Sequence, residues 1–168
     1  SSGKMGYSIA EAAIEAGAIV NLISGPVALN ANSKINLIKV NSANEMQKSV
    51  MDCMKTYDIF IWCAAVSDFK SAYSNKKIKK ASPELNIKLK QNIDILNYIS
   101  NHNSLRPKLV VGFAAEKNNV IEYAKKKLDQ KHCDWIVAND VSDKTIGFNS
   151  SENEIAIISK NAPIEKIS

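Results

Sequence analysis

Arginine is almost absent from this sequence. Among its 22 lysine and arginine residues, Arg106 is the only arginine, although the formal net charge is +5. Readout of base edges and bidentate binding of phosphate both favour arginine over lysine. The positive charge therefore gives little support to a nucleic-acid partner, and we expect none.

Cysteine and long apolar runs are also scarce. The three cysteines, Cys53, Cys63 and Cys133, are odd in number and far apart, which argues against a disulfide framework or a zinc site. We interpret them as small core residues in a reducing compartment and expect a cytoplasmic location. The longest apolar run, within Tyr57–Val66, is too short to span a bilayer, and no basic-then-apolar leader opens the chain. No membrane partner is expected.

Helical and strand patterns alternate along the 168 residues, whose composition fits one globular domain over residues 1–168. The predicted helices are Met5–Ala16, Ser42–Thr56, Ile93–Ser100 and Asn118–Lys131. The predicted strands are Ala18–Ser24, Ile35–Val40, Tyr57–Val66, Lys108–Ala114, Cys133–Ala138 and Glu154–Ser159. Strands that are apolar on both faces and separated by helices predict a doubly wound, Rossmann-like α/β fold with a mostly parallel sheet.

Two segments interrupt this alternation. In residues 76–90, Leu85, Ile87 and Leu89 alternate with polar residues after a turn signal, which predicts an inserted antiparallel two-stranded arm. The apolar face of such an arm needs a cover, so we expect a homodimer formed through it. Residues 139–153 are rich in Asp, Asn, Ser and Gly and are interpreted as a long, functional loop.

The start of the chain resembles the loop that follows a first strand. Ser1–Gly6 leads directly into a helix, with no strand pattern before it. We therefore expect the first strand of the domain to lie in residues that this sequence does not contain.

Candidate ligand-binding residues follow the predicted strands, because doubly wound sheets bind ligands outside the carboxyl ends of their strands. Gly3–Gly6 opens a helix and suits phosphate, or only allows close packing. Asp68 could hold a magnesium ion beside phosphates or merely cap its loop. Phe113 could flank a nucleoside or lie in the core, and Asn139–Asp140 is read first as a structural turn.

Lysine is unevenly distributed. Residues 70–90 contain seven lysines against one acid, Glu84, which indicates either a solvated face or a basic flap over an anionic ligand. Lys127 and Lys131 are four residues apart and share one helix face, which by itself is most simply a solvated face.

Tyr73 and Lys77 form the Tyr-x-x-x-Lys pair of short-chain dehydrogenases, so an NADP-dependent reductase is an alternative function. The pair is a weak signal because such pairs arise by chance in a lysine-rich chain. In addition, no G-x-G-x-x-G is present and no acid ends the second strand, Ala18–Ser24, where a ribose would bind.

Six motifs in serial order resemble one family across essentially the whole chain. They are Ser1-Ser2-Gly3-Lys4-Met5-Gly6, Leu22-Ile23-Ser24-Gly25-Pro26-Val27, Ala64-Ala65-Val66-Ser67-Asp68-Phe69, Lys77-Ile78-Lys79-Lys80, Val110-Val111-Gly112-Phe113-Ala114-Ala115-Glu116 and Ala138-Asn139-Asp140-Val141. Together they are similar to the bacterial phosphopantothenate–cysteine ligase, the C-terminal half of a bifunctional coenzyme A biosynthesis flavoprotein.

The resemblance implies a reaction. The carboxylate of 4′-phosphopantothenate would attack the α-phosphate of CTP, giving an acyl-cytidylate and pyrophosphate, and the amine of cysteine would then displace CMP. The substrates would thus be 4′-phosphopantothenate, cysteine and CTP, with Mg²⁺ as cofactor. In the bifunctional flavoprotein the ligase is fused to a flavin-dependent decarboxylase, so a fusion to such a domain is one possibility for this protein. That half is absent from this sequence, so no FMN is expected in this domain.

The same resemblance assigns site residues by motif. Lys77 matches the arm lysine that closes on the reacting phosphate, and Asp68 matches the acid beside the nucleotide and its cation. The implied nucleotide-binding set is Asp68, Lys77, Ile93, Asp94, Ile95, Leu96, Phe113, Lys127 and Lys131. Ile93 stands where the family has proline.

The family also has an asparagine and a glycine-rich first loop before the Ser1–Gly6 motif, and this sequence contains neither. We therefore expect the 168-residue chain alone to bind nucleotide poorly or to catalyse incompletely. A non-catalytic binding or assembly domain remains a third alternative.

Overall fold

The computed structural model describes residues 2–72, 86–116, 118–140 and 155–167. The helices are α1 (Lys4–Glu15), α2 (Ala43–Cys53), a short 3-10 turn (Met54–Thr56), α3 (Ile95–Ser100) and α4 (Val120–Lys131). The strands are β1 (Asn21–Ser24), β2 (Asn36–Lys39), β3 (Ile59–Trp62), β4 (Phe69–Ser71), β5 (Leu89–Gln91), β6 (Leu109–Glu116), β7 (Trp135–Asp140), β8 (Ile155–Ser159) and β9 (Glu165–Ile167).

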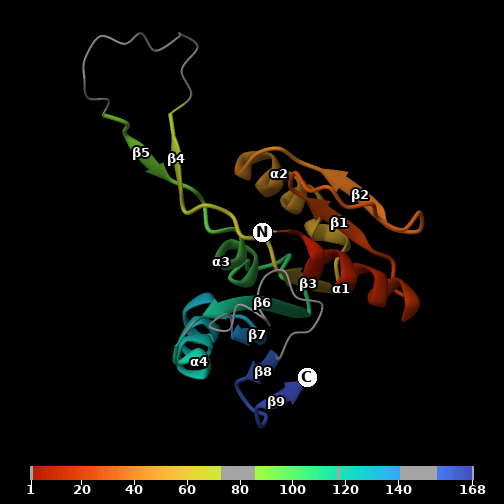
Figure 1. Ribbon diagram of the computed structural model, residues 1–168, viewed down its shortest axis with the longest axis vertical. Coiled ribbons are helices and arrows are strands. Elements are labelled where there is room, and N and C mark those ends of the chain that lie inside the picture. The colour runs from red at the N-terminus through yellow and green to blue at the C-terminus, as the bar shows by residue number, and fades with distance from the viewer. Residues whose placement is uncertain (1, 73–85, 117, 141–154, 168) are drawn as a thin grey trace.

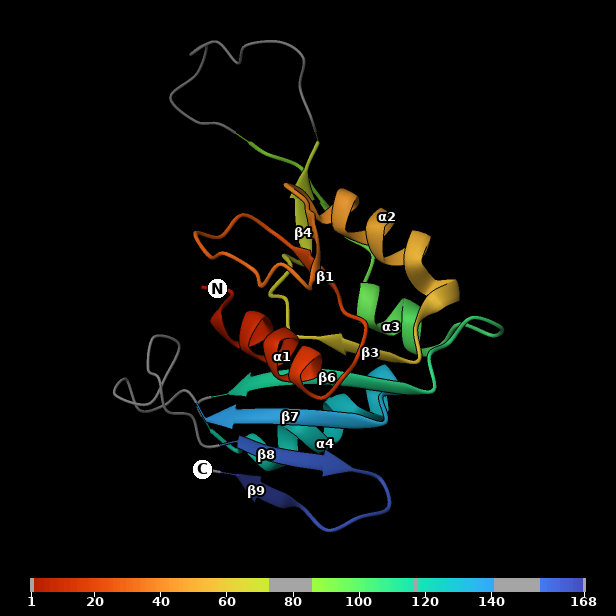
Figure 2. The same ribbon diagram turned by 90° about the vertical axis from the view of Figure 1, so that its right-hand side faces the viewer.

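The main sheet has five strands in the order β3-β6-β7-β8-β9. The β3, β6 and β7 strands are parallel, whereas β8 and β9 are added antiparallel (Figure 2). The predicted α/β architecture with a mostly parallel central sheet is therefore confirmed. The final strand, β9, was not predicted, because its three exposed residues carry no hydrophobic pattern.

The first two strands form a separate parallel pair, with Leu22 opposite Leu37 and Ile23 opposite Ile38. Among the described residues, no strand ladder joins this pair to the five-stranded sheet. The sequence pattern predicted both strands but not this division, since periodicity identifies a strand and not its neighbours.

Helices cover both faces of the main sheet. Figures 1 and 2 show α1 on one face and α4 on the other. The core beneath α4 contains the most deeply buried side chains, including Ile99 of α3, Val110 of β6, Ile136 of β7 and Ile158 of β8. Because successive residues of a strand point to opposite faces, residues that flank Ile136 and Ala138 in β7 point toward the α1 side.

Local interactions explain where α2 begins and where α1 ends. The Ser42 hydroxyl accepts a hydrogen bond from the Glu45 N–H at 3.2 Å, and the Glu45 carboxylate accepts one from the Asn41 N–H at 3.0 Å. This capping box places the N-cap at Ser42, where the predicted helix Ser42–Thr56 begins. The chain after α1 turns at Gly17, whose φ of +85° favours glycine and which directly follows the predicted helix Met5–Ala16.

An antiparallel arm projects from the body of the domain (Figure 1). It consists of β4 and β5, with Phe69 opposite Gln91 and Ser71 opposite Leu89. The predicted arm is present between β3 and α3, but its pairing includes residues 69–71, before the predicted boundary at residue 76. The segment 73–85, with Tyr73 and Lys77, lies outside the described residues, and so does most of the predicted loop 139–153.

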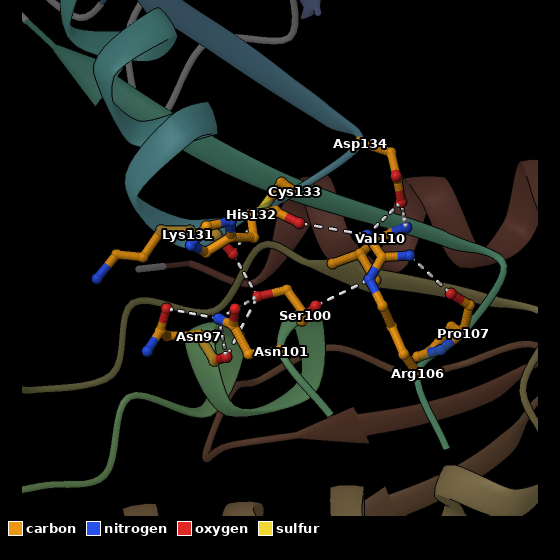
Figure 3. Close-up of polar contacts among 10 residues, drawn as sticks. All are labelled: Asn97, Ser100, Asn101, Arg106, Pro107, Val110, Lys131, His132, Cys133 and Asp134. Carbon is orange, nitrogen blue, oxygen red and sulfur yellow. Dashed lines mark hydrogen bonds and ion pairs between the residues drawn. The ribbon is translucent and has the colours of Figure 1, made fainter. Parts of the chain in front are cut away.

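A polar network holds α3 and the end of α4 against the amino ends of β6 and β7 (Figure 3). The Arg106 guanidinium donates to the Ser100 carbonyl at 2.8 Å and to the His132 carbonyl at 3.2 Å, and pairs with Asp134 at 2.9 Å. The same Asp134 oxygen accepts the Val110 N–H at 2.7 Å. Arg106 and its partner Asp134 thus link α3, the end of α4, β6 and the residue before β7.

Two remaining expectations concern cysteine and membranes. All three cysteines are free thiols, and Cys133 is buried. In the part of the chain that the structure describes, no helix has both the length and the apolar character needed to cross a bilayer.

Candidate functional site

A cavity of about 350 Å³ lies at the carboxyl ends of four strands. Its walls come from the segments that follow β1 and β3, from the end of β6, from Asn139 of β7 and from the first turn of α1. This is the edge where doubly wound sheets bind ligands. Segments that are far apart in the sequence, and that carry five of the six motifs, are brought together here.

Two glycines shape the wall formed by α1. Gly3 precedes the helix with φ of +78°, and a Cβ there would lie 3.0 Å from Val27. A Cβ on Gly6 would lie 3.1 Å from the Cys63 sulfur, so glycine lets the helix approach the segment after β3 closely. The N-cap residue Gly3 makes no side-chain cap, and the Ser2 hydroxyl accepts the Lys4 N–H at 3.4 Å. Among the described residues, the N–H groups of Met5 and Gly6, which line the cavity, have no side-chain acceptor. The predicted phosphate-binding role of Gly3–Gly6 is compatible with this geometry.

A second group of predicted residues lies beside the cavity, centred on Phe113. The Lys127 ammonium donates to the Phe113 carbonyl at 2.6 Å, and Lys131 forms an ion pair with Asp94. Lys127 and Lys131 are both partly buried, whereas Lys125 and Lys126 of the same helix are exposed. The predicted shared face of Lys127 and Lys131 is therefore confirmed. It faces Asp94 and Phe113.

The charges of this group perturb two pKa values. Burial lowers the pKa of Lys127, and the neighbouring charge of Lys131 lowers it further, against the opposing effect of Glu116. Burial alone would raise the pKa of Asp94. Hydrogen bonds from Lys131 and from the Asn97 N–H outweigh that effect and hold the pKa below its ordinary value. Asp94 is thus a carboxylate at neutral pH, beside two lysines.

Asp68 lies at the base of the arm. Its side chain is exposed, and its carbonyl accepts the Asn92 N–H at 2.7 Å, while the Asn92 side chain donates to the Ser67 carbonyl at 2.8 Å. These bonds join the segment after β3 to the segment that leads into α3. No group of three acidic, histidine or cysteine side chains suited to a metal occurs among the described residues.

The predicted nucleotide segment from Ile93 to Leu96 divides into two parts. Ile93 is exposed and Asp94 caps α3 by accepting the Asn97 N–H at 2.9 Å. Ile95 and Leu96 are buried in the core, so only their backbone groups remain available to a ligand. Sequence spacing predicted the segment but did not separate its buried and exposed members.

Several cavity residues had no assigned role. Tyr7 donates to the Ser24 hydroxyl at 3.2 Å, and both are buried at the cavity wall. Cys63 also lines the cavity, and burial raises the pKa of its thiol. Asn139, which the sequence indicated as a turn, belongs to β7 instead. The signals in the sequence were its position after a buried apolar run and its place in the motif Ala138-Asn139-Asp140-Val141.

The Asp94 ion pair carries a prediction about pH. Replacing Asp94 with alanine removes the helix cap as well as the pair, and should lower the free energy of unfolding at pH 7 by roughly 1–2 kcal/mol. Asp94→Asn keeps a capping oxygen and removes only the charge, so it should cost less than about 1 kcal/mol, since the pair is partly exposed. Urea denaturation measures both values.

The direction of the pH dependence follows from the lowered pKa of Asp94. The stabilisation by the charge is complete above the unfolded-state pKa of about 3.9 and is lost as the pH falls through the folded-state value. The difference between the wild type and Asp94→Asn should therefore shrink below about pH 4. A difference that stays constant from pH 7 to pH 3 would contradict a role for this charge.

Comparison with known proteins gives a consistent result. Residues 1–168 match the family model described as the DNA/pantothenate metabolism flavoprotein C-terminal domain. The chain is 48% identical over 160 residues to the coenzyme A biosynthesis bifunctional protein CoaBC of Vibrio vulnificus strain YJ016, covering 94% of this chain and 40% of that protein. It is 44% identical over 174 residues to CoaBC of Escherichia coli strain K12, covering 99% of this chain and 43% of that protein.

A solved structure agrees with these relatives. The crystal structure of the C-terminal domain of the coenzyme A biosynthesis bifunctional protein CoaBC superposes with a TM-score of 0.80 at 36% identity, over 100% of this chain and 74% of that one. The chain spans about 40% of the length of the curated relatives that it matches. On the match along its whole length, it belongs to the family of DNA/pantothenate metabolism flavoprotein C-terminal domains.

Proposed function

We propose that this chain is the ligase domain of a coenzyme A biosynthesis protein and joins 4′-phosphopantothenate to L-cysteine at the expense of CTP. The observation that carries the proposal is the cavity at the carboxyl ends of β1, β3, β6 and β7, with the lysines of α4 beside it at Phe113. The reaction needs a site for a small acid next to a site for a nucleotide. The cavity could hold the first, and the lysines beside it could bind the phosphates of the second. The family match supports the same assignment.

The proposed reaction has two steps. In the first, a carboxylate oxygen of 4′-phosphopantothenate forms a bond to the α-phosphorus of CTP, and pyrophosphate leaves. In the second, the amine of cysteine attacks the acyl carbon, CMP leaves, and the nitrogen loses a proton. Both steps gather negative charge on phosphate oxygens, so positive groups held in place beforehand should supply most of the stabilisation.

The residues of this chain suit that requirement. Within the described ranges, Lys127 has one protein acceptor, the Phe113 carbonyl. An ammonium group has three N–H donors, so two are available there for phosphate oxygens. The start of α1 offers the backbone N–H groups of Met5 and Gly6 and the positive end of a helix dipole to the phosphate of the acid substrate. The nucleotide phosphates and the phosphate of the acid substrate are thereby assigned to opposite walls of the site.

Asp68 is proposed as the protein ligand of Mg²⁺. Mg²⁺ is commonly bound through one or two carboxylates together with substrate phosphates, so a single exposed carboxylate fits this ion better than a closed protein cage would. The ion would neutralise charge on the nucleotide phosphates. Lys77 is proposed to reach the reacting phosphate from the arm, although it lies outside the described residues.

The arm also supports a proposed homodimer. Phe69, Ile87 and Leu89 expose large apolar side chains on it, and such surfaces on a projecting arm are usually covered by another chain. The relatives are longer than this chain. We therefore further propose that the domain is one part of a larger protein, in which it performs the CTP-dependent step next to a flavin-dependent decarboxylase domain. The free cysteines are compatible with the proposed cytoplasmic location.

Binding and turnover measurements test the function. We expect the native-length protein to bind CTP with Mg²⁺ in preference to ATP and NADPH by calorimetry, and to release CMP only when cysteine and 4′-phosphopantothenate are both present. Lys77→Ala should slow CMP release by roughly 10²–10³-fold. NADPH binding without CTP binding would overturn the proposal and favour the reductase. Binding of CTP without CMP release would favour a non-catalytic domain.

A further inference from the structure

An asparagine at the base of the arm bonds to two successive carbonyl groups. The paired part of the arm ends at Phe69, opposite Gln91. One residue further toward the body of the domain, the Asn92 N–H donates to the Asp68 carbonyl at 2.7 Å. The Asn92 side chain then donates through Nδ2 to the Ser67 carbonyl at 2.8 Å. Asn92 therefore extends the hydrogen bonding of the arm by two residues beyond the last strand pair.

These bonds fix the backbone around Asp68. The Ser67 hydroxyl donates to the Phe69 carbonyl at 2.7 Å and so closes a turn over Asp68. The carbonyl before Asp68 and the carbonyl of Asp68 itself are both bonded to Asn92. The side chain of Asp68 remains exposed. Its carboxylate can therefore meet a ligand only within the range that its own two side-chain torsions allow.

Stability does not explain an asparagine at position 92. A carbonyl accepts and cannot donate, so the Ser67 carbonyl requires Nδ2 to face it, and Oδ1 lies on the other side of the amide. In the part of the chain that the structure describes, this Oδ1 is buried and accepts no hydrogen bond. An unpaired buried acceptor costs at least as much free energy as one hydrogen bond contributes. The gain from the Ser67 bond is thus offset within the same side chain.

The location of Asn92 indicates a role at the nucleotide. Two residues later, Asp94 caps α3 and pairs with Lys131 of α4. Lys127, one turn earlier in that helix, is the lysine proposed to bind phosphate oxygens. A short stretch of chain, anchored at both ends, therefore connects Asp68 to the lysine face of α4. Asn92 forms the anchor at the Asp68 end.

We propose that Asn92 is a positioning residue for Asp68, whose carboxylate it holds at the place where the nucleotide and its magnesium ion bind. This inference rests on the proposed function. Asn92 acts through Asp68 and touches neither the ion nor the nucleotide. Mg²⁺ demands near-octahedral geometry at short distances, so a displaced carboxylate binds it poorly. Residues that orient a metal ligand typically contribute about 10- to 100-fold in metal affinity or activity.

The test compares Asn92→Ala with wild type in the native-length protein. The variant keeps the backbone bond to Asp68 and loses the side-chain bond. We expect the Mg²⁺ concentration for half-maximal CMP release to rise roughly 10-fold or more, and KM for 4′-phosphopantothenate to stay within about twofold. Saturating Mg²⁺ should restore most of the rate, because excess ion compensates for a weaker site. The melting temperature of the ligand-free protein should change by less than about 4 °C, since the bond and the unpaired oxygen are lost together.

Asn44→Ala is the matched control. Asn44 of α2 accepts a hydrogen bond from the Lys70 ammonium at 2.7 Å, so it also joins the base of the arm to the body through one side chain. That bond is exposed and involves neither Ser67 nor Asp68. The control makes the same chemical change, and its Mg²⁺ requirement should stay within about twofold of wild type.

Calorimetry gives a readout without turnover. With CTP as the only substrate, Asn92→Ala should bind roughly 10-fold more weakly than wild type at low Mg²⁺ and less than about threefold more weakly at saturating Mg²⁺. A residue with a merely structural role would weaken CTP binding by the same factor at both Mg²⁺ concentrations. The dependence on the ion thus separates positioning of Asp68 from a general loss of structure.

Three results would overturn the inference while leaving the proposed function intact. One is an unchanged Mg²⁺ requirement in Asn92→Ala. Another is an equal change in Asn44→Ala, which would point to attachment of the arm in general. The third is a melting temperature lowered by more than about 4 °C with parallel losses for CTP and the acid, which would make Asn92 a structural residue. If wild type releases no CMP, the proposed function fails instead. CTP calorimetry then tests Asn92 by itself, and equal affinities at low Mg²⁺ would overturn the inference.

Discussion

Replacing Lys127 with methionine is expected to lower kcat/KM for CTP by roughly 10²–10³-fold. Methionine keeps most of the length and apolar volume of the side chain but removes its ammonium group. Coupled release of CMP, measured at several CTP concentrations with the acid and cysteine saturating, gives this value. The unfolding free energy, from urea denaturation, should fall by no more than about 1.5 kcal/mol, the contribution of one hydrogen bond.

The size of this effect follows from the surroundings of Lys127. The ammonium group is partly buried and donates to the Phe113 carbonyl at 2.6 Å, so it is already in position before a nucleotide arrives. Burial lowers its pKa, which reflects weaker solvation of the charge. A charge that is poorly solvated by water interacts more strongly with a phosphate than an exposed lysine does.

The neighbouring lysine provides a matched control. Lys126 is on the same helix and is exposed, so Lys126→Met should change kcat/KM by less than about twofold, as expected for a screened surface charge. Equal losses in the two variants would point to the general positive charge of α4 and contradict a specific role for Lys127. A loss confined to KM for cysteine would also contradict a contact with the nucleotide.

Replacing Arg106 with methionine is expected to lower the free energy of unfolding by roughly 2–4 kcal/mol. The change removes three hydrogen bonds to main-chain carbonyls, at Ser100, Pro107 and His132, together with the ion pair to Asp134. The side chains of Arg106 and Asp134 are only 28% and 35% exposed. Their bonds are therefore poorly replaced by water. Urea denaturation at pH 7 measures the loss.

An exposed ion pair tests whether burial is the cause. Lys108 pairs with Asp58 at 2.8 Å, but their side chains are 86% and 76% exposed. Lys108→Met should therefore change the free energy of unfolding by less than about 1 kcal/mol. If the Arg106 and Lys108 variants lost similar amounts of stability, partial burial would not explain the contribution of the network that links α3, β6 and β7 in Figure 3.

The sequence by itself determined most of the helices and strands of the fold and their order. Buried apolar runs and helical spacing are local signals, so β3, β6, β7 and α4 could be located to within a few residues. The same locality explains why the shared face of Lys127 and Lys131 was correct: four residues make about one helical turn. Serial motifs also predicted the family, because their order is independent of any contact in space.

Only the tertiary structure decided how these elements meet. The separate β1–β2 pair, the added strand β9 and the pairing of residues 69–71 with 89–91 depend on partners distant in the sequence. The ion pair of Asp94 with Lys131 and the side-chain bond of Asn92 to Ser67 arise in the same way. Hydrogen bonds, burial and charge pairing are set by the atoms that surround a side chain, and the chain acquires those surroundings only when it folds.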